Sequence, residues 1–151
     1  MSIAERPFSS ESRDFVVASH FLEHCRNPIG TLETFFRVLK LGGKLYLVVP
    51  DKRFTFDVNR PTTTLERILE DYGKGNAGSH REHYLEWARF VENEPDETIE
   101  SHVDVLIISD YSIHFHVWTY FEIQEFVLAG NECIFILKKT DTREAGTTHA
   151  R

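Results

Sequence analysis

The sequence is poor in cysteine, has fewer basic than acidic residues, and contains no long apolar run. Its 2 cysteines, Cys25 and Cys133, form no CxxC pair, which argues against a disulfide framework. The 24 acidic residues outnumber the 17 basic ones and give a net charge of -7, which is unfavourable for binding nucleic acid. No stretch approaches the roughly 20 apolar residues of a membrane span, and the polar N-terminus is unlike a signal peptide. We therefore expect a cytoplasmic protein whose thiols are reduced. We expect it to bind neither nucleic acid nor membranes.

The sequence contains enough hydrophobic residues to form one hydrophobic core. The hydrophobic fraction is 41% and the aromatic fraction is 13% of 151 residues, so the length favours one domain over two. We expect this single domain to span residues 1–139, with residues 1–13 as an N-terminal arm. The polar residues 140–151 show no apolar periodicity and are expected to form a flexible tail.

A strand, a helix and a second strand are predicted near the N-terminus. The apolar run Phe15–Ala18 is typical of a strand buried on both faces, and Leu45–Val49 is a second such run. Asn27 and Pro28 form a helix-start signal between them, and the glycines at 42–43 form a stop signal. The helix has one apolar stripe: Leu32, Phe35, Phe36 and Leu39. This order indicates a parallel strand pair with a crossover helix, hence an α/β fold.

Three more helices are predicted in the middle of the chain. Thr63 with Glu66 and Ser79 with Glu82 have the spacing of capping boxes. A less regular helix is expected over Asp96–Ile108 after a proline. The apolar stripes of the first two are Leu65, Ile68, Leu69 and Tyr72, and Tyr84, Trp87, Ala88 and Val91.

Two stretches carry a family resemblance. "DFVVASHFLEH" (14–24) followed by "PIGTLETFFRVLKLGGKLYLVVPD" (28–51) resembles the segment after the cofactor-binding half of class I S-adenosylmethionine-dependent methyltransferases of the type 11 kind. A weaker resemblance extends to Phe121–Leu128 and Asn131–Lys138, which are predicted to form a hairpin. The resemblance implies a Rossmann-like mixed sheet, closed by the C-terminal antiparallel hairpin beside the family's fifth strand.

The sequence departs from this family where the cofactor is bound. The resembling enzymes hold S-adenosylmethionine with a Gly-rich loop and an acidic residue that ends their second strand, and neither precedes Asp14. The glycines at 73, 75 and 78 follow a predicted helix, so they favour a plain connection. A helix that the family carries after Thr119 is also lacking. We therefore expect the C-terminal half of such a domain, truncated and of doubtful independent activity.

Two functional hypotheses follow. The first is methyl transfer from S-adenosylmethionine to a small-molecule acceptor, with the cofactor required only if the protein is active. The second is a non-catalytic binding or assembly module that completes its sheet by homo-oligomerisation through an exposed edge, since unpaired strand edges tend to find partners.

The candidate catalytic residues follow the first predicted strand, where open α/β sheets place their ligands. His20 or His24 would act as a general base, because imidazole titrates near neutral pH. If the cofactor binds, the resemblance implies contacts from Ser19, His20 and Glu23. The alternative, which we weigh more heavily, is that Glu23 and His24 orient the loop and cap the helix by hydrogen bonding.

Paired histidines and two arginines supply a candidate substrate pocket. His114 and His116 alternate with apolar residues, so an extended strand would place both imidazoles on one face. The arginines suit a carboxylate or phosphate, although salt bridges within a surface loop are an equal alternative. No HExxH or CxxC framework is present, so no metal is expected. The pocket residues are Arg53, Arg60, His80, His83, His114 and His116.

Overall fold

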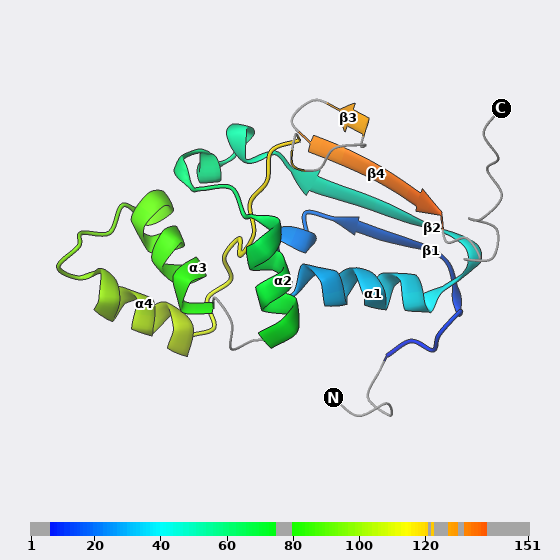
Figure 1. The fold of residues 1–151 in the computed structure, drawn as a ribbon, viewed down its shortest axis with the longest axis horizontal. Helices are drawn as coiled ribbons and strands as arrows, with labels where there is room; N and C mark the ends of the chain where they lie inside the picture. The colour runs from blue at the N-terminus through cyan, green and yellow to red at the C-terminus, as the bar shows by residue number, and fades with distance from the viewer. Residues whose placement is uncertain (1–6, 75–79, 121, 123–126, 130–131, 139–151) are drawn as a thin grey trace.

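The structure is a computed structural model, and it describes residues 7–74, 80–120, 122, 127–129 and 132–138. A mixed sheet runs through it in the order β1-β2-β4-β3 (Figure 1). β1 (Arg13–Ser19) is parallel to β2 (Leu39–Pro50). β4 (Glu132–Lys138) is antiparallel to both β2 and β3 (Val127–Ala129). The predicted α/β class, the parallel pair and the C-terminal hairpin are therefore confirmed.

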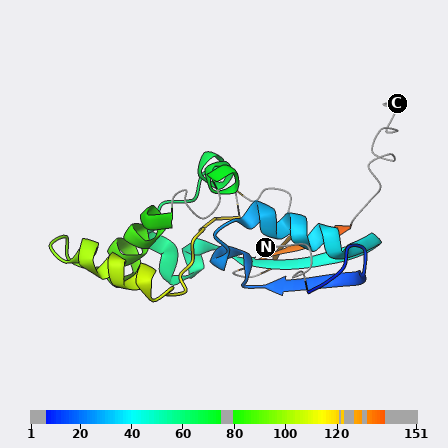
Figure 2. The same cartoon turned by 90° about the horizontal axis from the view of Figure 1, so that it is seen from below.

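The crossover helix α1 (Pro28–Val38) forms as the sequence predicts. The Asn27 side chain accepts a hydrogen bond from the backbone N–H of Gly30 at 2.8 Å, which satisfies an otherwise free amide. The apolar stripe of α1 packs on a core formed by the strands, and Figure 2 shows α1 lying over this face of the sheet. The buried members of the core are Ala18, Leu22, Leu39, Leu45, Leu47, Val49 and Trp118.

The glycines at 42–43 lie inside β2, at the irregularity where its register with β1 shifts between Arg13 and Phe15. Gly42 has φ of 81°, a conformation that side-chain-bearing residues rarely adopt. At Gly43 a Cβ atom would lie 2.9 Å from the Lys40 carbonyl oxygen and 3.1 Å from that of Asp14. The prediction that this pair ends the helix is therefore wrong, because α1 already ends at Val38 and Leu39 is its extended C-cap. The absence of a side chain at Gly43 instead allows β2 to approach β1 closely.

A second core lies beyond the C-terminal ends of β1 and β2, where α3 and α4 pack together (Figure 1). Its elements are α3 (His80–Trp87), the π-helix η6 (Ala88–Glu92) and α4 (Ile99–Ile108). The predicted helix from 96 to 108 thus begins three residues later, after Pro95. The buried side chains are Tyr84, Trp87, Ala88, Ile99, Val103, Leu106, Ile113 and Phe115.

Two predictions for α2 (Leu65–Lys74) are wrong. The hydroxyl of Thr64, one residue later than predicted, accepts from the N–H of Arg67 at 3.3 Å, because the Thr63 hydroxyl is engaged by the N–H of Val117 at 3.0 Å. The expected apolar stripe is largely exposed, and only Ile68 packs on the sheet core. This helix meets the rest of the fold along a narrow face, so Leu65, Leu69 and Tyr72 remain in contact with solvent.

The outer edge of β1 pairs with no strand in the described part of the chain. Phe15 and Val17 lie on the sheet face opposite α1 and are 70% and 62% exposed, so the prediction that this strand is buried on both faces is wrong. Within the described ranges, no helix has the length and apolar character needed to cross a bilayer. The predictions for Ser79, Gly75, Gly78 and the tail 140–151 lie outside the described residues.

Candidate functional site

Three segments meet at the C-terminal edge of the parallel strands. The turn η2 (Leu22–His24) follows β1, and the turns η3 (Lys52–Phe54) and η4 (Phe56–Asn59) follow β2. The extended segment 112–118 runs beside both, because the N–H of Phe115 donates to the Glu23 carbonyl at 2.7 Å and Trp118 forms a bridge with Asp51. The parallel strands and this returning segment therefore bring distant polar residues together.

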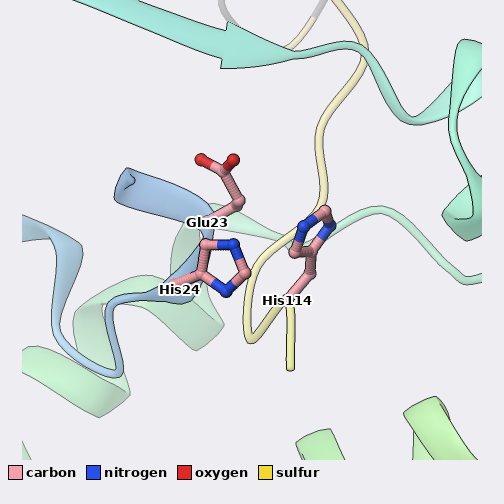
Figure 3. Close-up of side chains that lie close together, drawn as sticks. All are labelled: Glu23, His24 and His114. Atoms are coloured by element: carbon pink, nitrogen blue, oxygen red, sulfur yellow. The ribbon is translucent and has the colours of Figure 1, made fainter. Parts of the chain in front are cut away.

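Glu23, His24 and His114 form the first polar cluster, and Figure 3 shows their side chains close together. One potential ligand atom from each residue lies within 4.8 Å of the others. Glu23 is 1% exposed, and neither carboxylate oxygen has a hydrogen-bond partner among the described residues. The imidazole Nδ1 of His20 lies 3.7 Å from Glu23 Oε1. Burial raises the pKa of Glu23 above its ordinary value, against opposing effects from its own backbone N–H and from the nearby histidines.

The hydrogen bonds of both histidines define which ring nitrogen carries a proton. His24 Nδ1 lies 3.0 Å from the carbonyl oxygen of Ile113, and His114 Nδ1 lies 2.6 Å from Asp57 Oδ2. Both partners are acceptors, so each Nδ1 is the donor and each Nε2 of the neutral ring keeps its lone pair. The two rings meet edge to face with centroids 4.6 Å apart. The cluster therefore offers two imidazole nitrogens and one carboxyl group.

Asp57 and Arg60 fix the position of His114 through hydrogen bonds to its ring and to its backbone. The fully buried Arg60 donates to Asp57 Oδ1 at 2.9 Å and to the carbonyl of His114 at 2.6 Å. Burial would raise the pKa of Asp57, but hydrogen bonds from His114 and Arg60 outweigh it and hold the pKa below its usual value. Arg60 is therefore a structural residue of the site, and it is not available to grip a substrate.

Arg53 is also engaged by the chain. Its guanidinium donates to Asp51 Oδ2 at 2.6 Å, and Asp51 in turn accepts from the N–H of Tyr120 at 3.0 Å. Although burial of Asp51 acts in the opposite direction, these hydrogen bonds lower its pKa. Arg53 and Arg60 therefore form salt bridges with carboxylates of the same chain, which is the alternative to substrate binding stated above.

A second buried cluster contains Asp71, His83 and His116. His83 Nε2 lies 3.0 Å from Asp71 Oδ2, and His116 Nε2 lies 3.8 Å from the same oxygen. Burial lowers the pKa of His83 to about 3 and that of His116 to about 4. Both rings are therefore neutral at pH 7, held in a closed, water-poor environment.

The six predicted pocket residues do not form one site. Residues 111–117 form no regular strand, and both of their sides are enclosed by other elements, so His114 and His116 enter different clusters. His80 contacts the rings of Tyr84 and Phe115, and burial lowers its pKa. The expectation that His114 and His116 share one face is wrong for this reason.

Two residues of these clusters had no predicted role. Asp57 precedes Arg60 by three residues, and in a tight turn this spacing places the two opposite charges side by side. This spacing was the one feature of the sequence that could have indicated a role for Asp57. Asp71 had none, because its partners are 12 and 45 positions later in the sequence. Of the predicted catalytic residues, His20 lies at the exposed end of β1 and His24 lies in the first cluster.

Comparison with known proteins gives one family. A family model described as a methyltransferase domain matches residues 3–110, more than half of the chain. No curated protein and no solved structure matches significantly. The match and the strand order agree with the resemblance carried by residues 14–51. The chain belongs to the methyltransferase-domain family.

Proposed function

We propose that this chain takes part in methyl transfer from S-adenosylmethionine to a small-molecule acceptor at the C-terminal edge of β1 and β2. The observation that carries the proposal is the family membership, combined with a polar loop placed directly after β1. In open α/β sheets this edge is where ligands bind. Ser19 and His20 are exposed there, while Glu23 turns inward to the histidine cluster.

His20 is the proposed base. It adopts φ of 49° directly after β1, and its side chain is 47% exposed, so the ring is accessible to a ligand. In the reaction the bond from methyl carbon to sulfonium sulfur breaks, and its electron pair stays on sulfur as a neutral thioether. The acceptor oxygen or nitrogen forms the new bond to the methyl carbon, and its proton passes to the imidazole. Alignment of the two reactants provides most of the rate enhancement.

Cofactor binding tests this proposal directly. The cofactor contacts proposed here come from the loop after β1 alone, so we expect weak binding, with Kd on the order of 1 mM. Isothermal titration calorimetry should detect it, and His20→Ala should weaken it several-fold. His102→Ala removes a histidine that is paired with Glu92 far from this edge and should leave Kd unchanged. Undetectable binding at several millimolar cofactor would exclude methyl transfer by the chain on its own.

A second candidate function rests on the unpaired edge of β1. An exposed strand edge with apolar side chains is a ready pairing surface. We propose that a second copy of the chain pairs there and covers Phe15 and Val17, which makes the protein an assembly module as well as a member of an enzyme family.

Val17→Lys should break this assembly. A charged side chain in the paired edge would be buried beside an apolar surface, so the variant should be monomeric where the wild type forms an oligomer. Sedimentation equilibrium at several protein concentrations measures the mass. Val105→Lys, at an exposed position of α4, is the matched control and should leave the mass unchanged. A monomeric wild type at high concentration would refute the assembly function.

A further inference from the structure

We propose that Glu23, His24 and His114 bind a divalent transition-metal ion, with zinc as the best match to these ligands. The site goes beyond methyl transfer, and it does not depend on that activity. Two imidazole nitrogens and one carboxylate oxygen form a ligand set used by zinc enzymes, in which a fourth position is left to water or substrate.

The distances are close to those that a metal requires. Ligands about 2.1 Å from a tetrahedral ion lie roughly 3.4 Å from each other. The three candidate ligand atoms already lie within 4.8 Å of one another. The ligand atoms would have to approach one another by at most about 1.4 Å, through rotation of side chains that Figure 3 shows close together.

The outer hydrogen bonds are those of metal-binding histidines. A ligating imidazole usually donates its second N–H to a carboxylate or a backbone carbonyl, which orients the ring and increases its basicity. His24 donates Nδ1–H to the carbonyl of Ile113, and His114 donates Nδ1–H to Asp57. Arg60 in turn holds Asp57 and the His114 backbone. The lone pairs on both Nε2 atoms are thereby left for a cation.

The Glu23 carboxylate gives an independent reason to expect a cation. A carboxylate that is 1% exposed normally accepts several hydrogen bonds, whereas neither Glu23 oxygen accepts one from a described residue. The Nδ1 atom of His20 lies 3.7 Å from Glu23 Oε1, which is longer than a hydrogen bond. A bound metal ion would provide the interaction that this buried group lacks.

No pattern in the sequence indicated this site, because its ligands come from two distant segments. Glu23 and His24 are adjacent, but His114 lies 90 positions after His24 along the chain. No contiguous motif joins them, so the expectation of no metal followed from the absence of short-range patterns alone. The parallel strand pair and the returning segment create the juxtaposition.

Cobalt titration of the chelator-treated full chain tests the proposal. Co²⁺ replaces zinc in such sites, and its visible absorption reports coordination by nitrogen and oxygen ligands. We expect one equivalent to bind, and Zn²⁺ to displace it. Glu23→Gln and His114→Gln should each weaken Co²⁺ binding by at least about tenfold, because loss of even an outer-shell partner costs 10–100-fold. No S-adenosylmethionine is present, so failure here leaves the methyl-transfer proposal untouched.

Two controls make the result decisive. Glu23→Gln removes a buried charge that has no hydrogen-bond partner, so in chelator it should be at least as stable to urea as the wild type, which excludes misfolding as the cause of lost binding. His116→Gln alters the second cluster and should retain Co²⁺ affinity. Absence of Co²⁺ binding to the wild type, unchanged affinity in Glu23→Gln, or loss of binding in His116→Gln alone would each overturn the proposal.

Discussion

Replacing Arg60 by leucine is expected to lower the free energy of unfolding by about 3–5 kcal/mol, the usual cost of removing one partner from a buried ion pair. Arg60 is fully buried and is held by Asp57 at 2.9 Å and the His114 carbonyl at 2.6 Å. Leucine fills part of the volume of the arginine side chain. The buried Asp57 carboxylate, however, loses the hydrogen bond that Arg60 donates to it. Urea denaturation at pH 7 measures the difference.

The matched control for this substitution is a surface arginine. Arg89 is 53% exposed and pairs with Asp96 at 3.4 Å, so Arg89→Ala should change the free energy of unfolding by less than about 0.5 kcal/mol. If Arg60→Leu were as mild as Arg89→Ala, the ion pair behind His114 would not hold the site together.

Mild acid is the second condition with a large expected effect. The pKa values of His83 and His116 are about 3 and about 4 in the folded protein, against an ordinary value of 6.5. Below pH 6.5 the unfolded chain therefore binds protons that the folded chain does not, and stability falls as the pH falls. Each histidine contributes a slope of about 1.4 kcal/mol per pH unit, so both together should remove about 3–4 kcal/mol between pH 7 and pH 5.

Other groups modify this acid dependence in known directions. His80, whose pKa is also lowered, acts in the same sense, whereas Glu23 acts in the opposite sense because its pKa is raised. Urea unfolding at half-unit pH intervals gives the slope. His116→Gln should reduce it by about one proton. A free energy of unfolding that stays flat from pH 7 to pH 5 would show that these imidazoles are not buried and neutral.

The parallel strands and crossover helix could be predicted because their signals are local. Phe15–Ala18 is a continuous apolar run, and Asn27 with Pro28 marks the helix start, as the hydrogen bond to Gly30 confirms. The register of Thr63 and Thr64 could not be predicted, because the pairing of Thr63 with Val117 joins residues 54 positions apart. Such long-range pairing outweighs a local capping preference.

In the candidate site, too, the features with local sequence signals could be predicted, and those that depend on long-range contacts could not. His20, Glu23 and His24 could be selected because they end a predicted strand, where ligands of α/β sheets bind. The partition of His114 and His116 into two clusters could not, because it depends on elements that enclose the segment from both sides. Arg60 has the charge of a ligand-binding residue, and only its burial shows that it serves the fold.

The most direct measurement of the central claim is nuclear magnetic resonance of the histidine side chains during titration with S-adenosylmethionine. The proposal places the methyl donor at the exposed end of β1, beside Ser19 and His20. The imidazole resonances of His20 should therefore shift progressively at millimolar cofactor, while those of the surface residue His102 remain in place. His20 resonances that do not move, or shifts of equal size at His102, would contradict a methyl-donor site at this edge of the sheet.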